Sequence, residues 1–161
     1  MTAMIDTAAR IHALLALYRE SHYDVELARG GVATMRIGRL PPAALVRWLG
    51  SADVAYYLTA CNPHSQSLPQ KENDLRLEGL RAYVKSRAFP YLEGAGHIPG
   101  EAWREQCLLI RDIAEDDVAA LVRQHEQNSI VVLRAGAPTV LRLYRPDWRE
   151  IVGDAPDLEW A

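Results

Sequence analysis

Residues 53–87, "DVAYYLTACNPHSQSLPQKENDLRLEGLRAYVKSR", join an apolar run to an amphipathic one. The continuous apolar run over 53–60 is typical of a buried β-strand. The following pattern has apolar residues at helical spacing and predicts a helix from about Pro69 to Arg87. Many short hydrogen-bonding side chains stand at the junction between the two, which indicates either turn and cap chemistry or a binding site.

The alternation of strands and helices continues towards the C-terminus. Further strands are expected at 89–93, 106–113, 129–135 and 139–144. The glycine-containing segment 94–105 reads as a loop. A second helix begins at Glu115, where three successive acidic residues suit the positive end of a helix dipole, and Asn128 is expected to end it in a left-handed conformation. The order over 53–134 is therefore β-α-β-β-α-β, the ferredoxin-like unit.

The N-terminal part predicts additions to this core. Apolar residues at i, i+3, i+4 and i+7 indicate a helix from about Asp6; they are Ile11, Leu14, Leu15 and Tyr18. Residues 22–38 read as a β-hairpin, and Pro41-Pro42 opens a short helix that Gly50 ends. We expect an α+β fold, a two-layer sandwich with a ferredoxin-like core, and an irregular tail after Pro146.

Composition bounds the class of protein. The 161 residues, 49% of them apolar, suit a single domain over 1–161. The formal net charge is -3, with no dense basic cluster, so we expect no nucleic-acid partner. No stretch approaches the roughly 20 apolar residues that span a bilayer, so we expect no membrane partner either. The first residues lack a basic segment and an uninterrupted apolar one, and we expect a cytoplasmic protein.

The expected topology brings several polar segments to one end of the sheet. If the strand 53–60 runs upward, its end at Cys61–Ser67 lies at the top together with the beginning of the next helix. The loop 94–105 and the helix end at Gln127 and Asn128 also lie at the top. Because binding residues collect on loops that a rigid scaffold holds, we expect a site at this end.

Asn73 is the most informative residue of this candidate site. It is in line with Leu77, Leu80 and Val84, so its amide points inward at the beginning of the helix. Since a buried amide without partners costs about 1–3 kcal/mol, we expect it to pin the preceding loop, with contact to a ligand as the alternative. Arg76, one turn further on, either holds an anion or forms a salt bridge, which we favour. The expected partners are Glu72, Glu101 and Glu105.

Other chemistry has weaker support in the sequence. Cys61 with His64 or His97 could form a thiol–imidazole pair, but no spacing requires it. The histidines have neither H-x-x-x-H nor H-E-x-x-H spacing, so we expect no metal. The glycines of 94–100 do not form a phosphate loop, and we expect no cofactor.

Several segments, in this order, resemble the bacterial domain of unknown function 3293 family. They are "YRESHYDVEL", "TMRIG", "TACNPHSQSLPQKEN" with Arg76 after it, "GAGHIPGEAWREQCLLI" and "HEQNSIVV". The resemblance covers residues 17–132 and rests on the order and spacing of the pieces. It implies a small uncharacterised protein and adds no mechanism, because the family has no established activity.

Two positions depart from the family pattern. Cys61 stands where the family usually has a bulky aromatic residue, which argues against a catalytic thiol. Pro69 stands where the family usually has a serine that would pair with Glu72 in a capping box. Ser67 with Gln70 could supply a shifted box, which leaves Glu72 to the helix dipole or to a partner elsewhere.

Three functions remain open, and the first is the leading interpretation: binding of a small polar or anionic molecule. The expected ligand-binding residues are Asn62, Ser65, Glu72, Asn73, Arg76, Trp103, Glu105, Gln127 and Asn128. The second is an enzyme, a hydrolase or transferase, with Glu72 or Glu105 as general base, which needs a carboxylate of raised pKa beside open space. The third is a protein-interaction module whose strands at 22–38 or 139–144 pair with another chain, a homodimer included.

Overall fold

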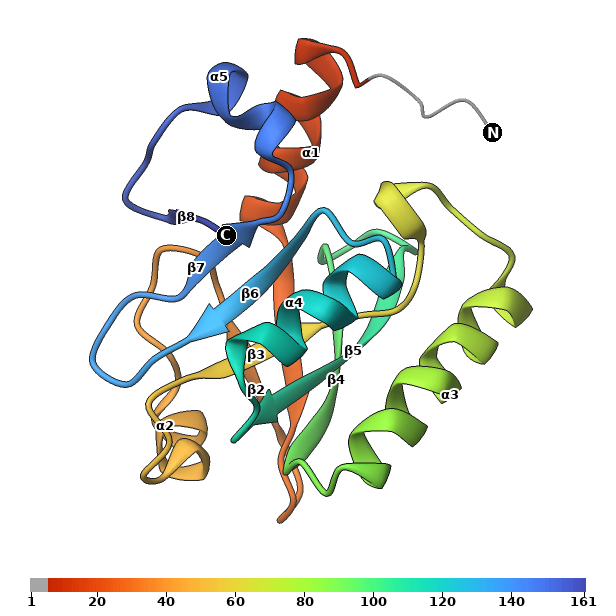
Figure 1. Ribbon diagram of the computed structural model, residues 1–161. Helices are drawn as coiled ribbons and strands as arrows, with labels where there is room; N and C mark the ends of the chain where they lie inside the picture. The colour runs from red at the N-terminus through yellow and green to blue at the C-terminus, as the bar shows by residue number, and fades with distance from the viewer. Residues whose placement is uncertain (1–5) are drawn as a thin grey trace.

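One curled sheet of eight strands organises the computed structural model, which describes residues 6–161 (Figure 1). The strand order is β2-β1-β4-β5-β3-β6-β7-β8, and every neighbouring pair is antiparallel except β7 and β8. The strands are β1 (His22–Glu26), β2 (Val32–Met35), β3 (Ala55–Leu58), β4 (Tyr91–His97), β5 (Arg104–Arg111), β6 (Ser129–Leu133), β7 (Val140–Leu143) and β8 (Leu158–Trp160). The helices are α1 (Ala8–Glu20), α2 (Ala43–Leu49), α3 (Gln70–Ser86), α4 (Glu115–Gln124) and α5 (Arg149–Val152), with 3-10 turns η1 (Pro63–Ser65) and η2 (Pro146–Trp148). The predicted α+β class is confirmed.

The central strand β3 is buried along its whole length. Its side chains alternate between two apolar clusters, with Tyr56 and Leu58 on one face of the sheet and Ala55 and Tyr57 on the other. A strand that is covered on both faces needs an apolar residue at every position, and this explains the unbroken apolar run in the sequence.

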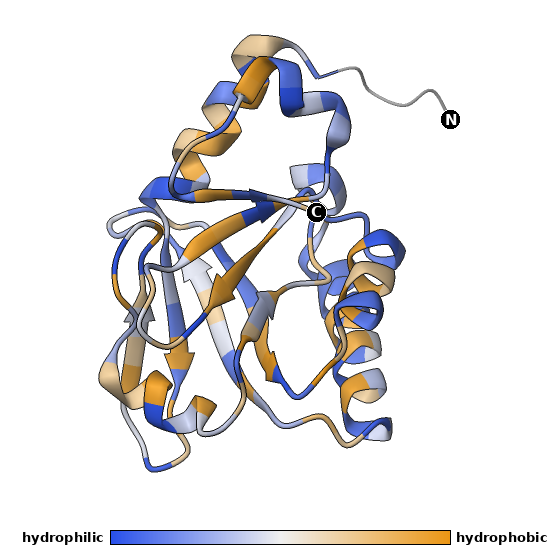
Figure 2. Ribbon diagram, turned by 60° about the vertical axis from the view of Figure 1, so that its left-hand side comes forward, coloured by the Kyte–Doolittle hydropathy of each residue, from blue (hydrophilic) through white to orange (hydrophobic). Residues whose placement is uncertain are grey.

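Helices α3 and α4 cover one face of the sheet. Their buried apolar residues are Leu77, Leu80 and Val84 of α3 and Val118, Leu121 and Val122 of α4. Hydrophilic and hydrophobic residues alternate along α3 in Figure 2, as expected for a helix with one buried stripe. The longest helix is α3 with 17 residues, and no helix of the described chain is long and apolar enough to cross a bilayer.

The opposite face of the same sheet carries a second apolar cluster. Helix α1 contributes Ile11, Leu14 and Leu15, α2 contributes Leu45 and Leu49, and Trp148 of η2 packs with them. The predicted two-layer sandwich is therefore not confirmed, because helices pack on both faces. The ferredoxin-like core over 53–134 stays a prediction, as does the single domain over 1–161.

The predicted loop over 94–105 is wrong at both ends. Strand β4 continues to His97, and β5 already begins at Arg104, because β1 supplies β4 with a second antiparallel partner. Gly94 belongs to this pairing rather than to a turn. A Cβ on Gly94 would lie 2.2 Å from the carbonyl oxygen of Asp24 and 2.9 Å from Tyr57 Oη, so the glycine permits the strands to approach closely.

The tail after Pro146 is regular, which corrects the expectation of an irregular end. After η2 and α5, β8 pairs in parallel with β7, whose other side pairs with β6. The strand predicted at 139–144 is thus paired within the chain on both sides and offers no free edge to a partner. A three-residue strand far along the chain from its partner has too short an apolar pattern to be read from sequence.

Candidate functional site

The loop after β3 is held by a pair of asparagines. The backbone N–H of Asn62 donates to Asn73 Oδ1 at 3.0 Å, and Asn73 Nδ2 donates to Asn62 Oδ1 at 2.8 Å. Asn62 Oδ1 also accepts the N–H of Leu68 at 3.0 Å. Asn73 is buried, and both polar atoms of its amide bond to this loop, so the interpretation of Asn73 as a loop pin is confirmed.

Arg76 joins the strand end that precedes the loop to the end of α4. Its Nε donates to the carbonyl oxygen of Ala60 at 2.6 Å and its Nη2 to that of His125 at 2.9 Å. The predicted salt bridge is wrong, since no carboxylate of the described residues pairs with Arg76. The reason is local: a strand end and a helix end both leave carbonyl oxygens without partners at this point.

Unusual backbone geometry accompanies these bonds. Asn62, His64 and Ser65 have φ values of 48°, 51° and 58°, in the left-handed region that non-glycine residues rarely adopt. The His64 N–H donates to the carbonyl oxygen of Glu126 at 2.7 Å, and Gln127 Nε2 donates to that of Cys61 at 2.9 Å. Left-handed conformations persist where neighbours hold them, and here both the loop and the end of α4 do so.

Helix α4 does not end as predicted. Glu126, with φ of 54°, takes the left-handed position that the sequence assigned to Asn128. Asn128 is buried and uses its side chain instead: Oδ1 accepts from Arg145 Nη1 at 3.0 Å, and Nδ2 donates to Tyr18 Oη at 3.2 Å and to Ser65 Oγ at 3.3 Å. The Tyr18 and Ser65 hydroxyls also bond to each other.

A cavity of about 120 Å³ opens beside this network, between α1 and the sheet. Six of the nine expected site residues line it: Asn62, Ser65, Trp103, Glu105, Gln127 and Asn128. The polar segments that were expected at one end of the sheet do come together there. Asn73 and Arg76 lie outside the cavity and hold its loop from behind.

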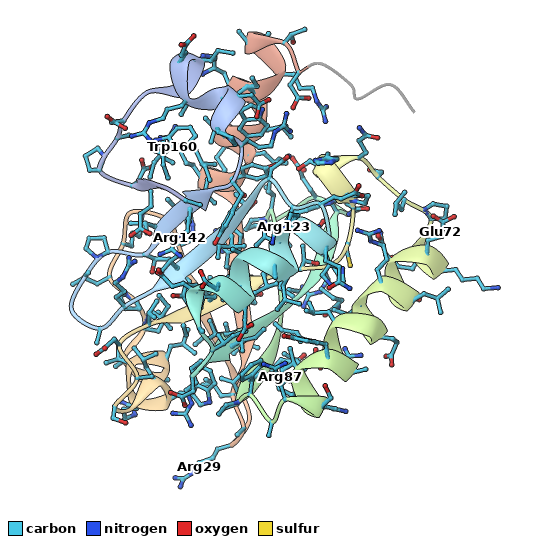
Figure 3. The ribbon with its side chains drawn as sticks, viewed as in Figure 1. Arg29, Glu72, Arg87, Arg123, Arg142 and Trp160 are labelled. Carbon is cyan, nitrogen blue, oxygen red and sulfur yellow. The ribbon has the colours of Figure 1, made fainter. Side chains whose placement is uncertain are left out.

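Glu72 lies apart from the cavity. It is exposed in the first turn of α3, and Figure 3 shows it at the end of that helix, away from the sheet. The helix has no side-chain cap at Pro69, and Gln70 bonds to Asp74 rather than to Ser67, so neither capping box forms. Glu72 is therefore left with the favourable end of the helix dipole.

Among residues 6–161, Glu105 is the one acidic residue that lines the cavity. Asn62 Nδ2 donates to its Oε2 at 2.8 Å, and Oε1 has no hydrogen-bond partner among residues 6–161. Burial raises the pKa of Glu105 to about 7, and the bond from Asn62 opposes the rise. The carboxyl group therefore changes its charge near neutral pH.

The sequence reasoning missed the aromatic wall of the cavity. Tyr18 of α1, Tyr23 of β1 and Tyr57 of β3 also line it, and the Tyr18 hydroxyl bonds to Ser65 of the loop. Tyr23 Oη donates to the carbonyl oxygen of Tyr18 at 2.5 Å, and Tyr57 Oη donates to that of Asp24 at 2.8 Å. Burial raises the pKa of each of the three phenols, which keeps them neutral. The signal for Tyr18 was present, because it is the last member of the apolar stripe of the first helix.

The cysteines and histidines do not assemble into a reactive group. Cys61 and Cys107 are free and buried, and burial raises the pKa of both thiols. His97 Nε2 pairs with Asp24 Oδ2 at 2.7 Å instead of with Cys61. Within residues 6–161 no group of three His, Cys, Asp or Glu side chains could hold a metal ion.

The comparison with protein families agrees with the resemblance found in the sequence. Residues 58–130 match the model of a family described as protein of unknown function (DUF3293). The match supports the resemblance to that family over this part of the chain. The DUF3293 match contains the loop 61–68, Asn73, Arg76, Glu105 and Asn128, whereas Tyr18 and the rest of α1 precede it. A search of curated proteins found no match, and a search of solved structures found none.

Proposed function

We propose that this protein binds a small polar molecule in the cavity between α1 and the sheet. The observation that carries the proposal is the convergence of polar groups from separate segments on space that no side chain fills. Ser65 and Asn62 come from the loop, Glu105 from β5, and Asn128 from the connection to β6. Asn73 and Arg76 support the proposal because they fix the loop backbone before any ligand arrives.

The lining of the cavity argues for a ligand that is not an anion. Its residues include Glu105 but no Lys, Arg or His. Arg76, which the sequence offered for an anion, donates to backbone carbonyl oxygens outside the cavity. A negative group would lie near an acidic side chain with no cation to compensate, so the proposal is limited to neutral or positively charged molecules.

A second candidate is an enzyme that uses Glu105 as general base. A base works best when its pKa lies near the working pH, and that of Glu105 is raised to about 7 beside open space. Glu72 drops out of this role because it is exposed and distant from the cavity lining. Binding remains the first proposal, since the lining contains no second acid among residues 6–161 and burial raises the pKa of its thiol, Cys107.

The interaction module keeps less support, because polar residues from three of the expected segments border a cavity instead of filling this end of the sheet. Its remaining surfaces would be the sheet edges at β2 and β8, through which a homodimer could form. We also propose a ferredoxin-like unit over residues 55–133, supported by the strand order β4-β5-β3-β6 and by α3 and α4 on one face. A cytoplasmic location fits two free, buried cysteines.

The binding proposal is tested by filling the cavity. Gly96 lines it, and a Cβ there would meet Tyr23 at 3.6 Å and Trp103 at 3.9 Å, which is ordinary contact. Gly96→Val therefore places side-chain atoms inside the cavity and reduces its free volume, and its Cβ meets no backbone atom. Gly79→Ala is the control, since nothing lies within 4 Å of a Cβ on this residue of α3.

The measurement is a ligand-observed NMR screen of small polar fragments against the three folded proteins. We expect fragments that bind the wild type and Gly79→Ala and lose binding to Gly96→Val. A screen in which no fragment distinguishes the wild type from Gly96→Val would contradict the proposal.

A further inference from the structure

The charge of the cavity points to a class of ligand. Among its lining residues Glu105 is the only acid, and the lining contains no basic side chain. The other titratable groups near Glu105 are Tyr18, Tyr23, Cys61 and Cys107, and burial keeps each of them neutral by raising its pKa. Arg104 and Asp74 border another hollow, which Glu105 and Asn62 also line. Among residues 6–161 the lining therefore presents one carboxyl group and no basic side chain; Arg145, which donates to Asn128, lies outside the lining.

One of the two oxygens of this carboxyl group has a hydrogen-bond partner among residues 6–161. Asn62 occupies Oε2, and Oε1 has no partner in the described part of the chain. Oε1 is consequently an acceptor for a donor that comes from outside the protein. An N–H donor that carries positive charge gives the stronger bond to a carboxylate.

The remaining walls suit the body of an organic cation. Tyr18, Tyr23, Tyr57 and Trp103 surround the space with aromatic rings. Aromatic faces attract cations and pack against apolar groups. The hydroxyl hydrogens of Tyr23 and Tyr57 are already donated to carbonyl oxygens, so these two phenols present no free donor to a ligand.

The volume limits the size of the molecule. The cavity measures about 120 Å³. An apolar cavity of about 150 Å³ in another protein holds one benzene molecule. The space thus suits one small ring or branched group with a single polar substituent, and it is too small to enclose a nucleotide or a peptide.

We infer that the cavity takes a small organic ammonium ion, ring-sized or smaller, whose N–H group donates to Glu105 Oε1 and whose apolar body packs against the tyrosines and Trp103. This inference rests on the proposed binding function and names its ligand class. Glu105 is the specificity-determining residue, because it is the one charged group of the lining.

Binding of such an ion depends on pH through Glu105. The ammonium ion needs the ionised carboxylate, and the ionised fraction rises about tenfold from pH 6 to pH 8 for a group of pKa about 7. The affinity for an alkylammonium ion should rise by about the same factor over this range. A neutral molecule of the same shape should show no such rise.

Three probes of one shape test the inference: cyclopentylamine, cyclopentanol and cyclopentanecarboxylate. Each is titrated into ¹⁵N-labelled protein, and amide shifts of the cavity residues report binding. Glu105→Gln keeps the shape of the side chain and an acceptor for Asn62, and Glu72→Gln removes one exposed charge outside the cavity as a control. We expect the amine to bind most tightly, to gain about tenfold between pH 6 and pH 8, and to lose this gain in Glu105→Gln alone.

The other outcomes separate the two proposals. If cyclopentanol shifts the cavity residues as strongly as the amine, the binding function stands and the ammonium inference is overturned. Tighter binding of the carboxylate overturns it as well. If none of the three probes shifts the cavity residues, the inference and the proposed function both fail.

Discussion

At the scale of single residues, polar side chains in this protein divide into those that hold the cavity and those that face it. Asn73 accepts from the backbone N–H of Asn62 and donates to its side-chain oxygen. Arg76 donates to backbone carbonyl oxygens, whereas Glu105 keeps one oxygen without a partner among residues 6–161. The sequence identified both kinds as one group, because an inward-pointing amide and a ligand-binding amide have the same pattern. The three-dimensional structure separates them, because Glu105 lines the cavity and Asn73 and Arg76 do not.

The raised pKa of Glu105 predicts how stability depends on pH in the absence of any ligand. The folded pKa, about 7, lies above the usual value of 4.5, so the folded state binds this proton more tightly than the unfolded state. The contribution is therefore complete in acid and is lost as the pH rises to the folded pKa. For one group with this shift, the free energy of unfolding falls by about 2 kcal/mol from pH 5 to pH 8.

Urea unfolding of the wild type and Glu105→Gln at pH 5 and pH 8 checks this expectation. The glutamine stays neutral, so the difference in stability between the two proteins should shift in favour of the variant at pH 8. Glu72→Gln is a control from an exposed position and should show no such shift. If the stability difference between wild type and Glu105→Gln is the same at both pH values, the pKa of Glu105 is not raised in the folded protein.

At the scale of elements, regular periodicity was readable and strand pairing was not. The helix α3 and the strand β3 that precedes it follow from apolar spacing, and both were predicted within a few residues. The extension of β4 to His97 depends on its pairing with β1, which lies about seventy residues earlier. Glycines in that stretch suggested a loop, although Gly94 serves a close approach of two strands. The site was predicted in part for the same reason: its loop is local, but its aromatic wall comes from distant elements.

Two glycines of β4 should respond differently to the same substitution. A Cβ on Gly94 meets a backbone oxygen at 2.2 Å, which cannot move without disturbing the pairing of β1 and β4. We expect Gly94→Ala to lower the free energy of unfolding by about 1–3 kcal/mol or to prevent folding. Gly96→Ala meets side-chain atoms at 3.6 Å or more and should change it by less than about 0.5 kcal/mol. Urea unfolding of both variants decides the matter, and equal losses would show that the strands separate easily.

At the scale of the whole molecule, the N-terminal and C-terminal parts of the described chain together cover the face of the sheet that carries the cavity. Figure 1 shows α5 and η2 beside α1, above the sheet. Trp148 is fully buried among the residues of that face, and Arg145 joins Asp6 at 3.0 Å and Asn128 at 3.0 Å. Arg19 of α1 pairs with Asp157 at 2.8 Å. The C-terminal segment therefore fixes α1, which in turn supplies Tyr18 to the cavity.

The last strand also protects an edge of the sheet. Strand β8 covers β7, and Glu159 of β8 accepts from Arg142 Nε at 3.1 Å and also pairs with Arg134. Figure 3 shows Arg142 and Trp160 at this side of the molecule. An uncovered β7 would present apolar residues and free backbone groups to any other chain, because exposed strand edges template pairing.

Removal of residues 154–161 should therefore change both stability and association. A chain that ends at Gly153 loses the Glu159 and Asp157 ion pairs, and we expect its free energy of unfolding to fall by about 3 kcal/mol or more, since the buried Arg142 then keeps only its pair with the exposed carboxylate of Glu115. Its free β7 edge should pair with a second copy, so the mass measured by sedimentation should rise above that of the full chain. Glu159→Gln is the matched control, because it breaks the ion pairs but retains β8; it should lose stability without a rise in mass. A truncated chain that sediments as the full chain does would show that β7 needs no cover, and β8 would then serve mainly to fix α1 over the cavity.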